Sequence, residues 1–228
     1  MKKLAFILLL GSAFSCAEQE NKTITVNTIG ALREIMHQGQ FQTRVSLDTL
    51  VNKGTYGLGA MSKLSGEVLV LDGKTYGSFV QGEDIVIGEV EDLKATLFVY
   101  SEVEIWDTVH VEGADDLDAL LSQKASQFGI SEPFPFQLLG SPELDYHVIN
   151  FDPVNGDFSK HKEGSYKSEL SGSDVIILGF YATKAKGIYT HHDSNLHMHV
   201  ITSDRSIMGH VDRLNIERGT YKLLIPKR

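Results

Sequence analysis

The stretch that most constrains the fold is residues 196–211, in which two mostly apolar segments flank one polar turn. Residues 196–201 and 207–211 are mostly apolar, and the segment between them contains Ser203-Asp204-Arg205-Ser206. Short apolar segments joined by a cluster of this composition predict two antiparallel strands and a tight turn. We therefore expect a β-hairpin here.

This hairpin predicts a cluster of histidines. A turn centred in the middle of the polar cluster places His199 opposite His210 and His197 opposite Asp212. Directly opposed residues of an antiparallel pair point to the same side of the sheet, as do residues two apart on one strand. The imidazoles of His197, His199 and His210 are therefore expected on one face.

Three imidazoles fixed on a sheet predict a metal site, with zinc as the ion that suits these ligands. Three protein ligands leave coordination positions open, which is typical of a catalytic centre. Asp212 is a candidate for holding the ring of His197 by a hydrogen bond. The alternative for the histidines is that they are ordinary polar residues on a solvent-facing strand. The alternative for Asp212 is a solvated aspartate at the end of that strand. His191 and His192, in the preceding loop, are expected to be solvated.

Residues 1–16 have the pattern of an export signal, with a basic start, the apolar run Leu4–Leu10 and a zone of small residues. The apolar run is too short to span a bilayer. Cys16 lies where a bacterial lipoprotein signal requires its cysteine, so we expect it to be the lipidated first residue of an exported, membrane-anchored protein. Simple secretion with cleavage after Ser15 is the alternative. Residues 17–24 are expected to be a polar tether.

The charge of the chain argues against nucleic acid as a partner. The formal net charge is −9, and loss of residues 1–15 with Lys2 and Lys3 changes it to −11. The sequence has no run rich in lysine and arginine. Cys16 is the only cysteine, so no intramolecular disulfide can form. The membrane is expected as a partner only through the lipid anchor.

Periodicity predicts an α+β fold of mixed or antiparallel sheets with a few short helices. Helical spacing predicts helices near 29–37, from Ser46 to Gly54, and near 115–127. Apolar runs bounded by turn residues predict strands within 66–77, 94–111, 134–139, 145–151, 166–170 and 174–181. We expect two β-rich halves that share one core, residues 25–130 and residues 131–228, with the metal site in the second half.

Glu67 is unusual in its predicted strand. Residues 66–77 form a hairpin with Asp72-Gly73 as its two-residue turn. The first strand of this hairpin is apolar on both faces, and Glu67 shares the face of Leu69 and Leu71. A carboxylate in such a position is costly unless it is paired, protonated or functional. The alternative is a glutamate at the strand end that leans into solvent.

Two motifs resemble the acetolactate decarboxylase family. The first comprises Gly57-Leu58-Gly59, Leu64-Ser65-Gly66-Glu67-Val68-Leu69-Val70-Leu71-Asp72-Gly73 and Tyr76. The second comprises Leu196-His197-Met198-His199, Ser203-Asp204-Arg205 and Gly209-His210-Val211. Weaker similarity extends from about Thr25 to Pro226. The second motif is the more specific, because the histidine spacing and the Ser-Asp-Arg turn coincide.

The resemblance implies that the three histidines bind Zn²⁺ and that Glu67 lies beside the metal. It implies the conversion of 2-hydroxy-2-methyl-3-oxobutanoate (2-acetolactate) to acetoin and carbon dioxide, with zinc stabilising an enediolate as a Lewis acid. Glu67 is the expected proton donor if burial keeps its pKa high. The resemblance also suggests a homodimer.

Two groups that the resemblance implies are missing from this sequence. One is an arginine in the first part of the second half, but no arginine lies between Arg44 and Arg205. The other is a glutamate after the last strand, and Glu217 comes too early for it. Two alternatives therefore stay open: an enzyme acting on another 2-hydroxy-3-keto acid, and an exported metal-binding lipoprotein that only binds a small ligand.

Overall fold

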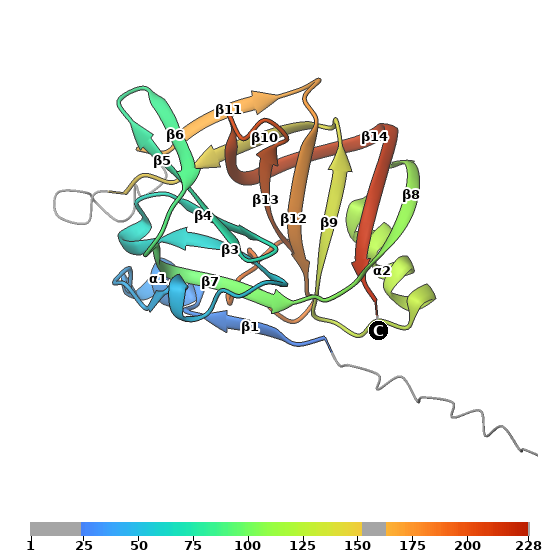
Figure 1. Ribbon diagram of the computed structural model, residues 1–228, viewed down its shortest axis with the longest axis horizontal. Helices are drawn as coiled ribbons and strands as arrows, with labels where there is room; N and C mark the ends of the chain where they lie inside the picture. The colour runs from blue at the N-terminus through green and yellow to red at the C-terminus, as the bar shows by residue number, and fades with distance from the viewer. Residues whose placement is uncertain (1–23, 152–162, 228) are drawn as a thin grey trace, which may run out of the picture.

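Two antiparallel sheets, each of seven strands, make up the body of the protein (Figure 1). The computed structural model describes residues 24–151 and 163–227. The predicted signal at residues 1–16 and nearly all of the predicted tether lie outside the described residues. Within the part that is described, no helix is both long and apolar enough to cross a membrane. The α+β class predicted from the sequence is confirmed.

The first sheet contains the strands that precede residue 103. Its order is β1-β7-β3-β4-β5-β6, and β2 also pairs with β7. The strands are β1 (Val26–Ile29), β2 (Val45–Ser46), β3 (Thr55–Met61), β4 (Glu67–Leu71), β5 (Lys74–Gln81), β6 (Asp84–Glu89) and β7 (Lys94–Glu102). The predicted β4–β5 hairpin is confirmed. Asp72 and Gly73 have φ values of 50° and 80°, the left-handed pair that a two-residue hairpin turn of this kind requires.

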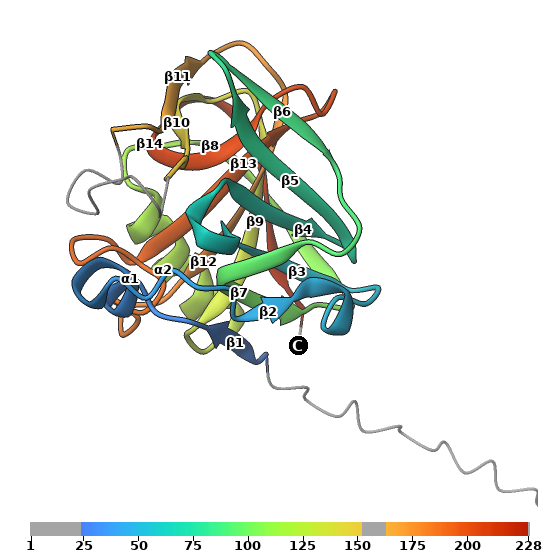
Figure 2. The same ribbon diagram turned by 90° about the vertical axis from the view of Figure 1, so that its left-hand side faces the viewer.

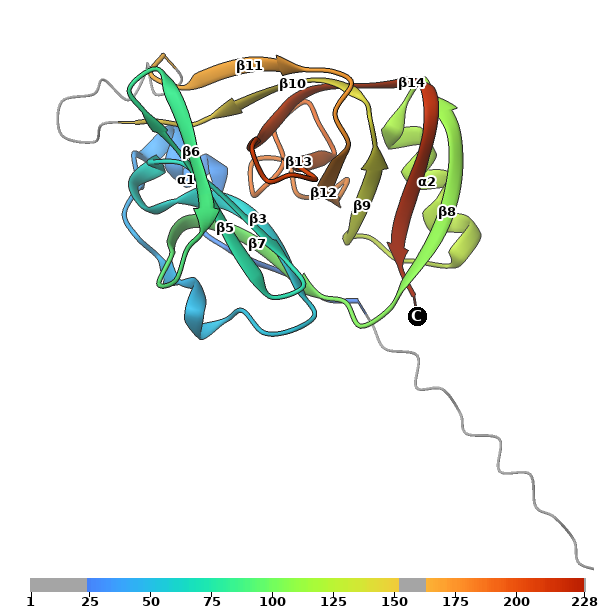
Figure 3. The ribbon, with the colours of Figure 1, turned by 45° about the horizontal axis from the view of Figure 1, so that its top comes forward.

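The second sheet curls until it closes on itself. Its strands are β8 (Trp106–Ala114), β9 (Phe134–Gly140), β10 (Glu143–Val148), β11 (Tyr166–Leu170), β12 (Val175–Tyr181), β13 (Leu196–Thr202) and β14 (Met208–Pro226). The long strand β14 pairs with β13 and β10 near its start and with β9 and β8 near its end. Since β9 also pairs with β12, and β12 with β13, these strands form a closed ring (Figure 3).

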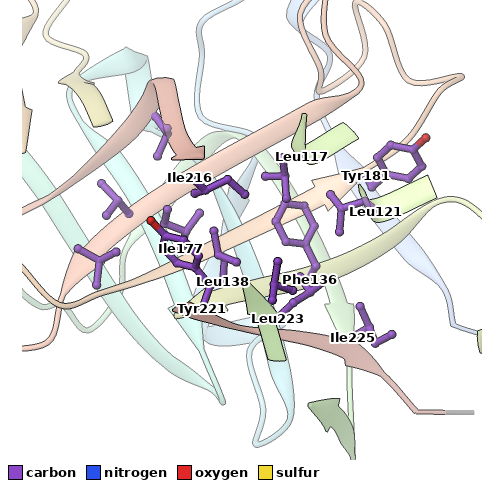
Figure 4. Close-up of a cluster of buried hydrophobic side chains, with 14 of the residues drawn as sticks. Leu117, Leu121, Phe136, Leu138, Ile177, Tyr181, Ile216, Tyr221, Leu223 and Ile225 are labelled. Atoms are coloured by element: carbon purple, nitrogen blue, oxygen red, sulfur yellow. The ribbon is translucent and has the colours of Figure 1, made fainter. Parts of the chain in front are cut away.

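Helix α2 (Leu117–Phe128) covers one side of this ring. Asp116 caps it by accepting hydrogen bonds from the backbone N–H groups of Asp118 and Ala119, and Gly129 ends it with φ 65°. The buried face of α2 packs on apolar side chains of β9 and β14 (Figure 4). The labelled members of this core are Leu117, Leu121, Phe136, Leu138, Ile177, Tyr181, Ile216, Tyr221, Leu223 and Ile225.

The two other predicted helices are shorter than expected. Helix α1 (Leu32–Gln38) starts after residue 29, because Ile29 is paired with Phe98 in the sheet. The helix predicted from Ser46 is only a 3-10 turn, η1 (Leu47–Thr49). Ser46 of β2 is paired with Lys94 of β7, and the Ser46 side chain makes no capping hydrogen bond. A second 3-10 turn, η2 (Ser62–Leu64), precedes β4.

The two sheets lie against each other (Figures 1 and 2). They share a buried core, as predicted. The members from the first sheet include Leu58, Leu69 and Val99, and those from the second include Leu178 and Ile201. The chain passes from one sheet to the other between β7 and β8, so β8 and α2, which precede residue 130, belong with the second sheet. Strand β3 contacts β12, and β4 contacts β14. A hydrogen bond also joins β4 to β13, and the site lies beside it.

Candidate metal centre

The β13–β14 hairpin places three histidines together. The register has His199 opposite His210, Val200 opposite Gly209 and Ile201 opposite Met208, as the sequence predicts. Ring centroids lie 5.2 Å apart for His197 and His199, 5.1 Å for His197 and His210, and 5.4 Å for His199 and His210. One nitrogen from each ring lies within 4.8 Å of the others. The three side chains are therefore close enough to hold one metal ion.

The buried ring nitrogens fit a metal. His199 donates its Nδ1–H to the Val68 carbonyl oxygen at 2.9 Å, which leaves Nε2 with a free lone pair. Among the described residues, His199 Nε2 and His197 Nδ1 are buried without a hydrogen-bond partner. Such orphaned atoms are rare unless a ligand satisfies them. Fixing one ring nitrogen by a backbone carbonyl is also how metal-binding histidines are oriented.

Burial holds these imidazoles in the neutral form that binds metals. It lowers the pKa of His199 to about 3 and lowers the pKa values of His197 and His210 well below their usual range. Neighbouring imidazoles add to each shift, and the hydrogen bond to Val68 opposes it at His199. A metal ion therefore need not displace protons from these rings at neutral pH.

His147, which the sequence analysis did not identify, is a fourth histidine at this site. It lies on β10, directly opposite His210 on the other side of β14, and its ring centroid is 4.8 Å from that of His210. His147 is 8% exposed. Its strand was predicted from the apolar pattern at 145–151, but pairing with β14 crosses more than sixty residues and has no local signal in the sequence.

Asp212 binds a different histidine from the one expected. His147 donates its Nδ1–H to Asp212 Oδ2 at 2.8 Å. The expected partner was His197, but the paired residues of β13 and β14 end at His199 and His210, and His197 pairs with Phe180 of β12 instead. That part of the prediction is wrong, because β14 turns from β13 toward β10 after His210.

Glu67 lies inside the site and is only 4% exposed, so the alternative of a solvent-facing carboxylate is wrong. Its Oε1 accepts a hydrogen bond from the Ile149 backbone N–H at 3.0 Å. Oε2 lies 3.5 Å from His199 Nε2, and Oε1 lies 3.9 Å from His147 Nε2. Burial raises the pKa of Glu67 to about 7, and Asp212 adds to this rise, while His147 and the Ile149 hydrogen bond oppose it.

The site opens into a small cavity of about 70 Å³ with mostly apolar walls. The polar groups are Glu67 and four histidines, of which His191 is the one supplied by the loop before β13. The His191 ring lies 5.9 Å from that of His210, whereas His192 is exposed. No arginine or lysine is among the described residues that line the cavity. The apolar lining residues are Leu32, Ile35, Met36, Ala60, Leu64, Leu97 and Ile149.

Gly59 lies in the cavity wall, at a position where β3 and β7 approach each other closely. A β-carbon at this position would lie 2.0 Å from the Leu97 carbonyl oxygen, closer than any real contact. Strands β3 and β7 can therefore approach here only because residue 59 has no side chain.

Comparisons with known proteins agree with these observations. The family described as "Alpha-acetolactate decarboxylase" matches residues 26–130. The alpha-acetolactate decarboxylase of Lactococcus lactis subsp. cremoris (strain MG1363) is 31% identical over 206 residues, covering 86% of this chain and 81% of that protein. The enzyme of the same name from Streptococcus thermophilus is 24% identical over 210 residues, covering 89% and 83%.

Solved structures show the same fold. The crystal structure of alpha-acetolactate decarboxylase from Bacillus subtilis strain 168 superposes with a TM-score of 0.71 and 16% identity, covering 88% of this chain and 85% of that one. A protein from Staphylococcus aureus described as of unknown function and similar to alpha-acetolactate decarboxylase gives a TM-score of 0.70, 16% identity and the same coverage.

Proposed function

The chain belongs to the alpha-acetolactate decarboxylase family, and on this premise we propose that it converts 2-acetolactate to acetoin and carbon dioxide with zinc bound by His197, His199 and His210. The observation that carries the proposal is the position of Glu67. The Glu67 carboxyl group is only 4% exposed, lies 3.5 Å from a histidine nitrogen that has no hydrogen-bond partner, and lines a cavity of about 70 Å³.

Zinc at this site would act as a Lewis acid that stabilises negative charge on substrate oxygens as carbon dioxide leaves. Loss of carbon dioxide breaks the bond between the carboxylate carbon and C2, and the electron pair stays on the remaining four-carbon unit. That unit must then take up one proton at C2 to become acetoin. A group that holds a proton near neutral pH is therefore needed beside the substrate.

Glu67 meets this need. In the metal-free site, burial favours its protonated form and raises its pKa to about 7, and a bound cation would oppose this rise. The Ile149 N–H holds Oε1, which fixes the plane of the carboxyl group and leaves Oε2 facing the histidines. Glu67 is therefore placed to deliver its proton to one face of the substrate.

The apolar walls serve the same step. Leu32, Ile35 and Met36 of α1 and Leu97 of β7 line one part of the cavity, so few waters can accompany a bound substrate. Exclusion of water strengthens electrostatic contacts in the site and limits solvation of the carboxylate that is lost.

The test uses purified protein beginning at residue 17, with bound metal and acetoin formation measured side by side. We expect about one zinc per chain and acetoin from 2-acetolactate. His199→Ala should lose both, and Glu67→Gln should keep the metal and lose most of the rate. Metal binding without acetoin would exclude this substrate, and the absence of bound metal in the wild-type protein would exclude the proposed centre.

We also propose that the protein is exported and anchored through a lipid on Cys16, and that it forms a homodimer. The sequence pattern of residues 1–16 supports the first statement, and the family supports the second. Cys16→Ser should abolish incorporation of labelled fatty acid, and light scattering of the soluble form should give twice the chain mass. Wild-type protein that incorporates no labelled fatty acid would contradict the lipid anchor, and a monomer in light scattering would contradict the homodimer.

A further inference from the structure

A second group of metal-capable side chains lies beside the histidine triad. His147, His210 and Asp212 each offer one ligand atom within 4.8 Å of the others. Their strands are adjacent: β14 carries His210 and Asp212, and β10 carries His147 directly opposite His210. The two groups share His210, which therefore lies between an inner triad (His197, His199, His210) and an outer triad (His147, His210, Asp212).

Asp212 is the solvent-exposed member of the outer triad, whereas His147 is 8% exposed and so about as buried as the inner histidines. His199 is 0% exposed and His197 6%, whereas the side chain of Asp212 is 43% exposed. The carboxylate of the outer triad, Asp212, is partly exposed, whereas Glu67, the carboxyl group 3.5 Å from His199 Nε2 of the inner triad, is buried. A partly exposed negative charge attracts a hydrated divalent cation more strongly than neutral imidazoles do.

Apart from Glu67, His191 and the histidines of the two triads, the cavity offers no imidazole or carboxylate ligand to a cation among its described lining residues. Most of its wall consists of aliphatic side chains of α1, β7 and neighbouring segments, which cannot replace water around an ion. Binding first to Asp212 and His147 would let the ion replace its bound waters with protein ligands one at a time.

The shared histidine makes the two positions exclusive. A neutral imidazole has one lone pair for a metal, so His210 can serve an ion in the inner triad or in the outer triad, but not in both. An ion bound in the outer triad already holds one of the inner ligands. A short movement then exchanges His147 and Asp212 for His197 and His199.

We infer that His147, Asp212 and His210 form an outer cation site through which a divalent metal ion enters and leaves the inner triad. This inference rests on the metal centre proposed above, and it adds a role for two residues that need not ligate the resident ion. The site would take divalent transition-metal cations, which suit a mixed donor set of imidazole and carboxylate.

The test measures the rates of metal binding rather than enzyme activity. Metal-free protein is mixed with Co²⁺ in a stopped-flow instrument and followed by visible absorbance, and release is measured with excess chelator. Asp212→Asn should slow both entry and release by about tenfold, because a route accelerates both directions, and the equilibrium dissociation constant should stay within about threefold. His147→Gln should behave in the same way, and it provides a second variant should Asp212→Asn not fold.

Asp84→Asn is the matched control, because it makes the same charge change at an exposed position in the first sheet. It should bind and release Co²⁺ at wild-type rates. Titration should reach one ion per chain in every variant. Unchanged Co²⁺ binding and release rates in both Asp212→Asn and His147→Gln would overturn the inference. So would an increased dissociation constant with an unchanged rate of entry, or the binding of two ions per chain. Failure of the wild-type protein to bind Co²⁺ would instead reject the metal centre itself.

Discussion

Replacement of Glu67 by glutamine tests both the chemistry and the energetics of the site. The two side chains have nearly the same shape, and the amide oxygen can still accept the hydrogen bond from Ile149 N–H, which is 3.0 Å long in the wild-type protein. The variant lacks the acidic proton. With metal bound, we expect kcat to fall by about 10²- to 10⁴-fold, the range for loss of a general acid, with the metal content unchanged.

The stability of the metal-free protein should change in the opposite direction. Burial raises the pKa of Glu67 from 4.5 to about 7, and each unit corresponds to about 1.4 kcal/mol. Between these values the folded state binds more protons than the unfolded state, so this group's contribution to stability falls as pH rises from 4.5 to 7. At pH 8 the metal-free Glu67→Gln protein should therefore have a free energy of unfolding about 3 kcal/mol higher than that of the wild type. At pH 5 this gain should be less than about 1 kcal/mol.

Urea unfolding of chelator-treated protein at pH 5 and pH 8 measures this difference. With a slope of about 2 kcal/mol per molar urea, the midpoint of Glu67→Gln should exceed that of wild type by about 1.5 M at pH 8. Glu83→Gln, at an exposed turn position, is the control and should show no such gain. An equal effect of Glu67→Gln at both pH values would refute the claim that burial penalises the ionised carboxylate.

Three further predictions concern the metal ligands and the cavity wall. His199→Ala should abolish stoichiometric zinc binding, measured by elemental analysis, because it removes a fully buried imidazole that we propose as a ligand. Retained zinc would contradict this assignment. Gly59→Ala should lower the free energy of unfolding by at least about 2 kcal/mol, because its β-carbon would meet the Leu97 carbonyl at 2.0 Å; wild-type urea stability would contradict this close approach. Metal-free protein should lose stability on acidification from pH 6.5 toward pH 3, because burial lowers the pKa values of His197, His199 and His210. In this range the unfolded state binds more protons than the folded state, and the free energy of unfolding should fall by up to about 1.4 kcal/mol per pH unit for each ring. A thermal-melting temperature that does not change over this range would argue against buried neutral imidazoles.

Local sequence was sufficient wherever a turn fixes the pairing of two strands. The polar cluster at 203–206 set the register of His199 with His210, and Asp72-Gly73 set the β4–β5 hairpin. The helix predicted near 115–127 was correct because its capping residues are adjacent to it in the chain. The helix predicted from Ser46 failed, because pairing of Ser46 with Lys94 outweighed a local capping preference.

The sequence by itself determined the three-histidine hairpin, since hydrogen bonding across a short turn and the two-residue period of a strand leave little freedom. Only the tertiary structure decided that His147 lies beside His210, that Asp212 binds His147, and that Glu67 from the other sheet faces the same site. These contacts join residues 63 to 132 positions apart, and they follow from packing of apolar faces between strands and between sheets. Packing of this kind depends on the shapes and the burial of side chains that are distant in the sequence. Local sequence therefore does not predict which strands come together.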